Sequence, residues 1–390
     1  MNRNTLIFGL LLIFGQVPAQ VLAATDQTLT PAERKIAQVR AVIEKNSQRY
    51  EPYAQLAMAL AQRARETSDT AYYTQAENAI KQSLDLSPGN LAAERVRIRL
   101  LLGRHEFASA LDAATALNKQ VPDDVQTYAY LTDANIELGR YADAEHTAQW
   151  MLDLRPGNIS GLTRAAYLRE LFGDISGSLD LMDQAYQRTP PTEYEDRAWL
   201  LTHMAHLQLL NNQPQHADAL LVEAMQQFPD YHYALAQLAK VRQAQGRPAE
   251  ALVLLRKHVT IAPHAENLFY LAEAMDQLGL KQEAGKVFRQ FETAARLESN
   301  TLDNANRELI AYYADYAKRP AEALRLAELE MARRQDVYTL DAYAWALYRN
   351  KKFKQAKHVI DRALMVGVRD PKIHFHAAKI ARKNGVTHPE

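Results

Sequence analysis

The chain has 390 residues and no cysteine, and its 46 basic and 46 acidic residues give a formal net charge of zero. The lack of cysteine excludes disulfide bonds, thiol catalysis and lipid attachment to a cysteine. A globular chain of this length would divide into about two or three domains, whereas stacked helix pairs would bury one elongated core.

The first 23 residues have the pattern of a signal peptide. Arg3 precedes a short apolar run, Leu6 to Phe14, which is too short to span a bilayer comfortably. Val21-Leu22-Ala23 suits a signal peptidase, so we expect cleavage after Ala23, with a retained anchor as the alternative. The pattern predicts an exported protein, in a bacterial periplasm.

A short helix is expected between the signal peptide and the rest of the chain. Thr30 is a good N-cap residue, Pro31 suits the first helical position, and Glu33 follows closely. Ile36 and Val39 lie on one apolar stripe of this segment. We expect the helix to cover the exposed end of the structure that follows.

A small residue recurs through the remaining chain at spacings of 33, 34 or 39 residues. Proline follows each of the first six positions by twelve residues, and glycine precedes several of them by five. Three residue types in phase over this length indicate a structural repeat of helix pairs. The small residues are Ala76, Ala110, Ala144, Ser178, Ala217, Ala251, Ala284, Ala323 and Ala356.

Residues 125–158 carry the pattern most completely, with Tyr128, Leu131, Gly139, Ala144 and Pro156. Here the chain resembles the tetratricopeptide repeat (TPR) family. Gly139 can end the first helix in a left-handed conformation, Ala144 lets the second helix approach closely, and Pro156 ends it. The resemblance implies an all-α, right-handed superhelical solenoid of about nine antiparallel helix pairs with terminal capping helices. It implies no particular activity, because the family shares none.

Some segments depart from the repeat pattern. Lys318 and Lys351 replace the glycine in the last two repeats, as Asn212 does in the fifth, which predicts different or looser turns in the last third. Five extra residues fall within each of the ranges 190–196 and 298–303, which we interpret as subdomain joints. About seven extra residues around 65–70 predict a longer loop between the helices of the first repeat.

The chain ends in a segment, Lys372 to Lys383, that resembles the first helix of a tenth unit. We expect it to cap the solenoid, because an open end would expose core. The expected organisation is a signal peptide (1–23), a leader and capping helix (24–49), TPR-like repeats 1–4 (50–192), 5–7 (193–298) and 8–9 (299–370), and a C-terminal capping helix and tail (371–390).

The sequence holds no recognisable catalytic motif. It lacks a glycine-rich phosphate loop, a His-Glu-x-x-His pair and a nucleophile elbow. His203 and His206 share a helical face without a nearby third ligand, which is a weak metal signal. We therefore expect a protein that is not an enzyme and that has no cofactor and no metal.

The resemblance implies that ligands lie in the concave groove, on the inner faces of the first helix of each repeat. From the fourth repeat onward, aromatic and acidic side chains dominate these positions. The predicted groove residues are Tyr167, Trp199, His206, Tyr233, Phe269, Glu273, Asp276, Tyr312, Asp315, Tyr316, Tyr338, Asp341, Trp345 and Tyr348. For any one aromatic residue, packing between repeats is the alternative.

Rigid aromatic faces among carboxylates suit two kinds of ligand. A peptide with Lys or Arg would meet the acidic groups, and a sugar would stack on the aromatic rings. A clamp of basic residues for a terminal carboxylate, which is the family's familiar cytosolic mode, is not expected, because few of the groove positions are basic.

Basic residues gather at the C-terminal end. From residue 349 to residue 390 there are eleven basic residues against three acidic ones. Lys351, Lys352, Lys354 and Lys357 are therefore candidates for contact with a membrane surface or another anionic surface, or they only solubilise an outer helix. Nucleic acid is not an expected partner in the predicted compartment.

These observations predict a non-catalytic protein-interaction scaffold of the cell envelope, which binds a protein or peptide segment in its concave groove. The alternative is a carbohydrate-binding solenoid of an envelope polysaccharide-export or cell-wall assembly.

Overall fold

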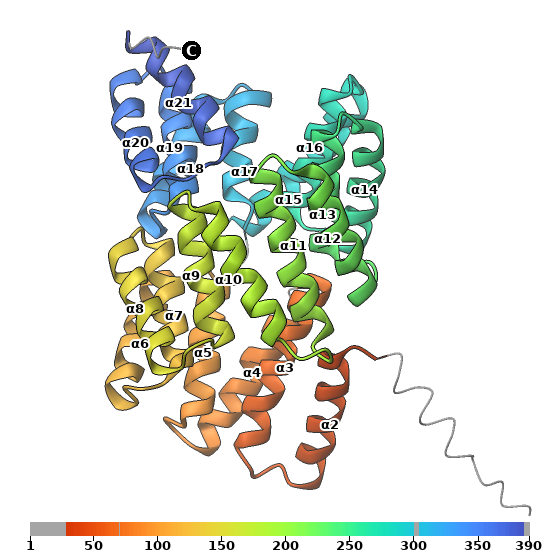
Figure 1. The fold of residues 1–390 in the computed structure, drawn as a ribbon, viewed down its shortest axis with the longest axis vertical. Coiled ribbons are helices and arrows are strands. Elements are labelled where there is room, and N and C mark those ends of the chain that lie inside the picture. The colour runs from red at the N-terminus through yellow and green to blue at the C-terminus, as the bar shows by residue number, and fades with distance from the viewer. Residues whose placement is uncertain (1–28, 70, 300–303, 386–390) are drawn as a thin grey trace, which may run out of the picture.

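The computed structural model describes residues 29–69, 71–299 and 304–385. This part of the chain forms twenty α-helices and one π-helical segment, without a strand. Nine successive helix pairs lie between two single helices (Figure 1). The single helices are α2 (Pro31–Lys45) and α21 (Pro371–Lys383), and the pairs are α3 (Glu51–Thr67) and α4 (Ala71–Leu86), α5 (Leu91–Gly103) and α6 (Phe107–Gln120), α7 (Val125–Glu137) and α8 (Tyr141–Leu154), α9 (Ile159–Leu171) and α10 (Ile175–Arg188), α11 (Tyr194–Leu210) and α12 (Pro214–Gln227), α13 (His232–Ala244) and α14 (Pro248–Ile261), α15 (Ala265–Gln277) and α16 (Lys281–Glu298), α17 (Asn306–Ala311) with η1 (Tyr312–Tyr316) and α18 (Pro320–Arg333), and α19 (Val337–Arg349) and α20 (Phe353–Val366).

Local sequence signals account for the helix boundaries. Asn90, Asp124 and Asn158 each accept a hydrogen bond from the backbone N–H three residues later, which satisfies a donor that the start of a helix leaves free. Gly139 follows α7 with a φ of +71°. Ala144 on α8 is completely buried. The helix-pair solenoid predicted from the repeat pattern is confirmed.

The two flanking helices also agree with the sequence. Thr30 caps α2 by accepting a hydrogen bond from the backbone N–H of Glu33, whose carboxylate accepts from the backbone N–H of Thr30 at 2.8 Å. Asp370 caps α21 by accepting hydrogen bonds from the backbone N–H groups of Lys372 and Ile373. The predicted signal peptide (1–23) and the final residues, 386–390, lie outside the described residues.

The turns without glycine share its left-handed φ. Asn212, Lys318 and Lys351 have φ values of +57°, +54° and +63°. The expectation of a different turn is wrong for Lys351, whereas at Lys318 the preceding helix ends in the π-helical segment η1 and the backbone N–H of Arg319 donates to the carbonyl oxygen of Tyr313, so this turn does differ. Packing of each helix pair imposes the left-handed residue, although a side chain there costs about 1–2 kcal/mol.

Extra residues mainly lengthen helices. In the first repeat they extend α3 to Thr67, so the predicted longer loop is wrong. Helices α11 and α16 have 17 and 18 residues, and residues 300–303 of the second insertion lie outside the described part of the chain. Ala185 and Ala198, on either side of the first insertion, belong to one hydrophobic cluster. The subdomain boundaries remain predictions.

The superhelix turns far enough to contact itself. The backbone N–H of Gln335 donates to the carbonyl oxygen of Glu137 at 2.9 Å, and the backbone N–H of Val337 donates to the hydroxyl oxygen of Tyr141 at 3.0 Å. The ends of α7 and α9 thus lie against the segments that flank α19 and α20 (Figure 1).

No helix of the described ranges is long and apolar enough to cross a membrane.

A second contact of this kind joins the first repeat to later ones. Arg65, in the extra turn of α3, pairs with Glu195 and Asp196 on α11. The backbone carbonyl of Arg65 also bonds the ring of His232 at 2.9 Å. These contacts enclose the space on the inner side of α3, α5, α7, α9 and α11.

Candidate functional site

Four of the predicted groove residues lie in the core. Phe269, Tyr312 and Trp345 are 1%, 7% and 7% exposed, and Asp341 is 6% exposed. Phe269 packs on Phe291, with ring centroids 5.3 Å apart. These side chains fill the contacts between neighbouring repeats, so the expectation that they line an open groove is corrected.

The core position of Trp345 has a specific chemical environment. Its ring stacks on the ring of His376 at 4.0 Å between centroids, and its indole N–H donates to the carboxylate of Asp315 at 3.0 Å. The His376 ring bonds Asp341 at 2.8 Å. The polar groups of Trp345 and Asp341 are therefore already satisfied within the fold.

His206 and its neighbour His203 share one carboxylate. Both rings bond Glu170 on α9, at 3.1 and 2.7 Å. Burial opposes the ionisation of Glu170, but the bonds from His203 and His206 outweigh it and lower the pKa of Glu170 to about 2. In the described residues, no group of three or more His, Asp or Glu side chains could hold a metal ion.

Other predicted groove residues lie side by side on an accessible surface. Trp199, His206 and Tyr233 line a depression of about 250 Å³ between α11 and α13. Tyr233 and Glu273 also line a larger cavity of about 480 Å³ between α13 and α15, together with Tyr270. We call Trp199, His206, Tyr233, Glu266, Tyr270 and Glu273 the aromatic-acidic strip.

Exposure singles out two tyrosines of the aromatic-acidic strip. Tyr233 and Tyr270 are 41% and 38% exposed, which is unusual for large side chains inside a solenoid. The charge of Glu308 raises the pKa of Tyr270, whose hydroxyl donates to Glu308 at 3.0 Å. Lys240 lines both cavities and is a cation among these carboxylates.

The other predicted positions are dispersed. Asp276 pairs with Lys281 at 2.8 Å, and the Tyr316 hydroxyl donates to Glu273 at 3.0 Å. Tyr167 lines a separate cavity of about 240 Å³. Asp315 is exposed, and Tyr338 and Tyr348 are partly buried.

The predicted basic residues lie on the outer C-terminal surface. Lys351, Lys352 and Lys354 are exposed. Lys357 is partly buried and pairs with Asp361 at 2.7 Å. Lys351 also lines a cavity of about 490 Å³ beside Tyr348.

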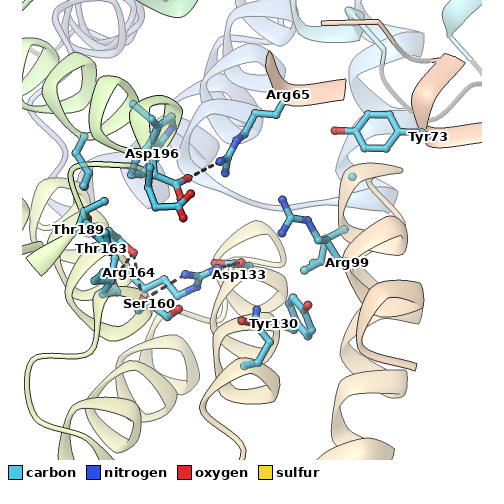
Figure 2. A pocket seen from close by; sticks show the side chains of 18 residues that line it. Arg65, Tyr73, Arg99, Tyr130, Asp133, Ser160, Thr163, Arg164, Thr189 and Asp196 are labelled. Carbon is cyan, nitrogen blue, oxygen red and sulfur yellow. Dashed lines mark hydrogen bonds and ion pairs between the residues drawn. The ribbon is translucent and has the colours of Figure 1, made fainter. Parts of the chain in front are cut away.

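The structure contains a further cavity that the sequence prediction missed. It has a volume of about 590 Å³ and lies between α3, α5, α7, α9 and α11. Figure 2 shows side chains from these helices pointing into it, including Arg65, Arg99 and Asp196. We call it the arginine cavity, because Arg65, Arg99 and Arg164 all line it.

Part of the arginine cavity was detectable from sequence. Arg99 occupies in the second repeat the position that Tyr167 occupies in the fourth, 68 residues later along a 34-residue period. Applying the groove positions to the second and third repeats would have marked Arg99, Gln126 and Asp133, which all line the cavity. Arg65 had no such signal, because it lies in the extra turn of α3.

Comparison with known proteins supports the fold. No family model matches the sequence, and no curated protein matches it. Among solved structures, a monomeric mutant of IFIT1 with m7Gppp-AAAA has a TM-score of 0.52 at 14% identity, covering 85% of this chain and 76% of that chain. The human IFIT1 dimer with m7Gppp-AAAA has a TM-score of 0.50 at 12% identity, covering 89% and 87%.

A thermophilic TPR protein of Thermus thermophilus, TTC0263, has a TM-score of 0.37 at 18% identity, covering 47% of this chain and 90% of that chain. At these identities the likeness concerns the fold alone. The nine successive helix pairs at the predicted repeat spacing give the chain the fold of a TPR solenoid. Solenoids of this class present extended concave binding surfaces.

Proposed function

We propose that the chain is a non-catalytic scaffold of the cell envelope that binds a protein segment along the aromatic-acidic strip. The exposure of Tyr233 and Tyr270 beside Glu273 is the observation that carries the proposal. Tyrosine offers a large rigid face with a polar tip and loses little rotamer freedom on binding, which makes it frequent at the centre of protein interfaces.

The charged side chains of the aromatic-acidic strip favour a partner segment that contains lysine or arginine. Glu266 and Glu273 line the larger cavity of the strip, and Lys240 is the one lysine or arginine among its described lining residues. A lysine or arginine of a partner could approach these carboxylates while its aliphatic part lies on the tyrosine rings. The location in the envelope is inferred from residues 1–23.

Site-specific crosslinking tests the location of the partner. A photoreactive amino acid in place of Tyr233 should yield a discrete adduct in an envelope extract. The same replacement at Val253, which is 67% exposed on α14, is the control for non-specific capture. Adducts of equal yield at both positions, or an adduct at Lys354 alone, would contradict the proposal.

Binding of the identified segment to purified protein then tests the chemistry. Tyr233→Ala should weaken binding by about tenfold or more, as for a central interface aromatic. Glu273→Gln should weaken it by a few-fold and reduce its dependence on ionic strength. Glu145→Gln, a matched change at an exposed glutamate on α8, should leave both quantities unchanged.

A further inference from the structure

Arg99 has no acidic partner in the described part of the chain, although it lines a cavity. Its guanidinium makes one hydrogen bond, to the sulfur of Met58 at 3.4 Å. A thioether is a weak acceptor, and a guanidinium has five N–H donors to satisfy. Burial and the neighbouring Arg65 lower the pKa of Arg99. Arg99 therefore carries a charge without a direct ion pair among the described residues, although the charge of Asp196 in the same cavity acts on it.

The other two arginines of the arginine cavity differ from Arg99. Arg65 pairs with Glu195 and Asp196, and Arg164 pairs with Asp133 at 2.6 Å. Their charges are neutralised by the protein itself. Because three guanidinium groups line one cavity and only Arg99 lacks an acidic partner among the described residues, Arg99 is the group that an external anion would meet.

Tyr130 supplies a second unsatisfied group in the same cavity. It is 2% exposed, and in the described residues its hydroxyl makes no hydrogen bond of ordinary geometry, although the side chain of Gln126 lies close to it. A buried hydroxyl without a partner costs free energy that a bound ligand would recover. Figure 2 shows Tyr130 and Arg99 on the same side of the arginine cavity.

The charged groups around the cavity limit the chemical class of ligand that it can bind. Asp133, Glu193 and Asp196 line it together with the three arginines. A ligand with several phosphate charges would be repelled by these carboxylates, whereas one carboxylate would match Arg99. The carboxylates of Asp133 and Asp196 are held by arginine and keep lone pairs that can accept hydrogen bonds from hydroxyl groups.

The remaining lining groups suit a hydroxyl-rich ring. Ser160 and Thr163 supply hydroxyl groups, and Trp199 supplies an aromatic face. A volume of about 590 Å³ is in the range of small-molecule sites.

We propose that the arginine cavity binds an acidic sugar, with the sugar carboxylate on Arg99 and the Tyr130 hydroxyl and the ring hydroxyls on Asp133 and Asp196. The two sites share Trp199, which lines both the arginine cavity and the depression between α11 and α13, but Arg99 and Tyr130 are not part of the aromatic-acidic strip. The proposal adds a small-molecule or glycan ligand to the scaffold.

Saturation-transfer NMR and calorimetry with the full chain test the class of ligand. D-glucuronate is the probe, D-glucose is the matched neutral sugar, and inorganic phosphate and a short acidic peptide are the competing anions. We expect D-glucuronate to bind at least about tenfold more tightly than each of the others, since hydrogen bonds to charged groups are the stronger ones. Equal binding of glucose, or tighter binding of phosphate or peptide, would overturn the assignment, as would no detectable binding of glucuronate.

Two variants test the residues. Arg99→Gln should weaken glucuronate binding by about tenfold or more without lowering the urea midpoint, because the guanidinium has no ion pair to lose. Tyr130→Phe removes only the unpartnered hydroxyl and should weaken binding by a few-fold. Arg97→Gln, on the exposed side of α5, is the control. Unchanged affinity in both Arg99→Gln and Tyr130→Phe would overturn the proposal.

If Arg99→Gln fails to fold, Arg99→Lys keeps the charge but removes the planar fork of donors. It should retain the fold and still weaken glucuronate binding relative to the Arg97→Gln control. Full affinity in Arg99→Lys together with full affinity in Tyr130→Phe would show that the carboxylate does not bind at these groups.

Discussion

The contact between turns of the superhelix can be tested with single glycine substitutions. Gly139 has a φ of +71°, and a Cβ atom there would lie 2.7 Å from the carbonyl oxygen of Gln335. Gly246 occupies the equivalent position three repeats later, with a φ of +73° and no atom within 4 Å of a Cβ. Gly139→Ala and Gly246→Ala therefore introduce the same backbone strain, and only the first disturbs the contact.

We expect the two variants to lose different amounts of unfolding free energy. The left-handed conformation costs an alanine about 1–2 kcal/mol in both variants. In Gly139→Ala the backbone around Gln335 must also move, which weakens the bonds from Gln335 to Glu137 and from Val337 to Tyr141, at 2.9 and 3.0 Å. Two such bonds contribute about 1–3 kcal/mol more.

Urea unfolding followed by circular dichroism measures the difference between the two variants. Small-angle scattering at native conditions should also show a larger radius of gyration for Gly139→Ala than for Gly246→Ala. Gly173→Ala, whose Cβ would lie 2.6 Å from the carbonyl oxygen of Gly367, should behave like Gly139→Ala. Equal unfolding free energies for Gly139→Ala and Gly246→Ala would refute the self-contact of the superhelix in solution.

Two further predictions concern titration and processing. Burial and the nearby Asp336 raise the pKa of Glu137 from 4.5 to about 7, so the folded state holds this proton more tightly and its contribution to stability falls as pH rises between those values. The measurement is the difference in urea midpoint between about pH 5 and about pH 8, for the parent protein and for Glu137→Gln. The variant should lose the decline in stability that the parent shows. A variant with the same difference as the parent would contradict the raised pKa. The mature protein from the native host should begin at Ala24, as intact mass would show; a chain that retains residues 1–23 would favour the anchor instead.

The sequence predicted the repeats because their signals are local. Ala144 must be small where two helices cross, and Pro156 cannot continue a helix, so both mark the architecture without reference to distant residues. Even the capping helix α2 followed from Thr30 and Glu33. By contrast, the substitution of glycine by Lys351 was misleading, because this residue adopts the left-handed φ of a glycine turn.

The site was less predictable, because it depends on how tightly the superhelix winds. Whether Trp345 faces a groove or a neighbouring repeat is decided by the rotation between repeats, which no single repeat encodes. The same holds for Arg65, whose partners on α11 lie 130 and 131 residues later. Trp199 and Tyr233 line one depression, and their role as ligand contacts remains a proposal.

The self-contact of the superhelix changes how the chain should fold and tolerate truncation. In an open solenoid each repeat contacts only its neighbours, so the stabilities of the repeats and their interfaces add up along the array. Removing an end repeat then loses that repeat and one interface. Here Val337 and Tyr141 are in contact across 196 residues. Contacts of such sequence separation slow folding, because a long stretch of chain must be ordered before they form. Removing the last two repeats would also expose the ends of α7 and α9, so the cost of successive deletions would not be additive.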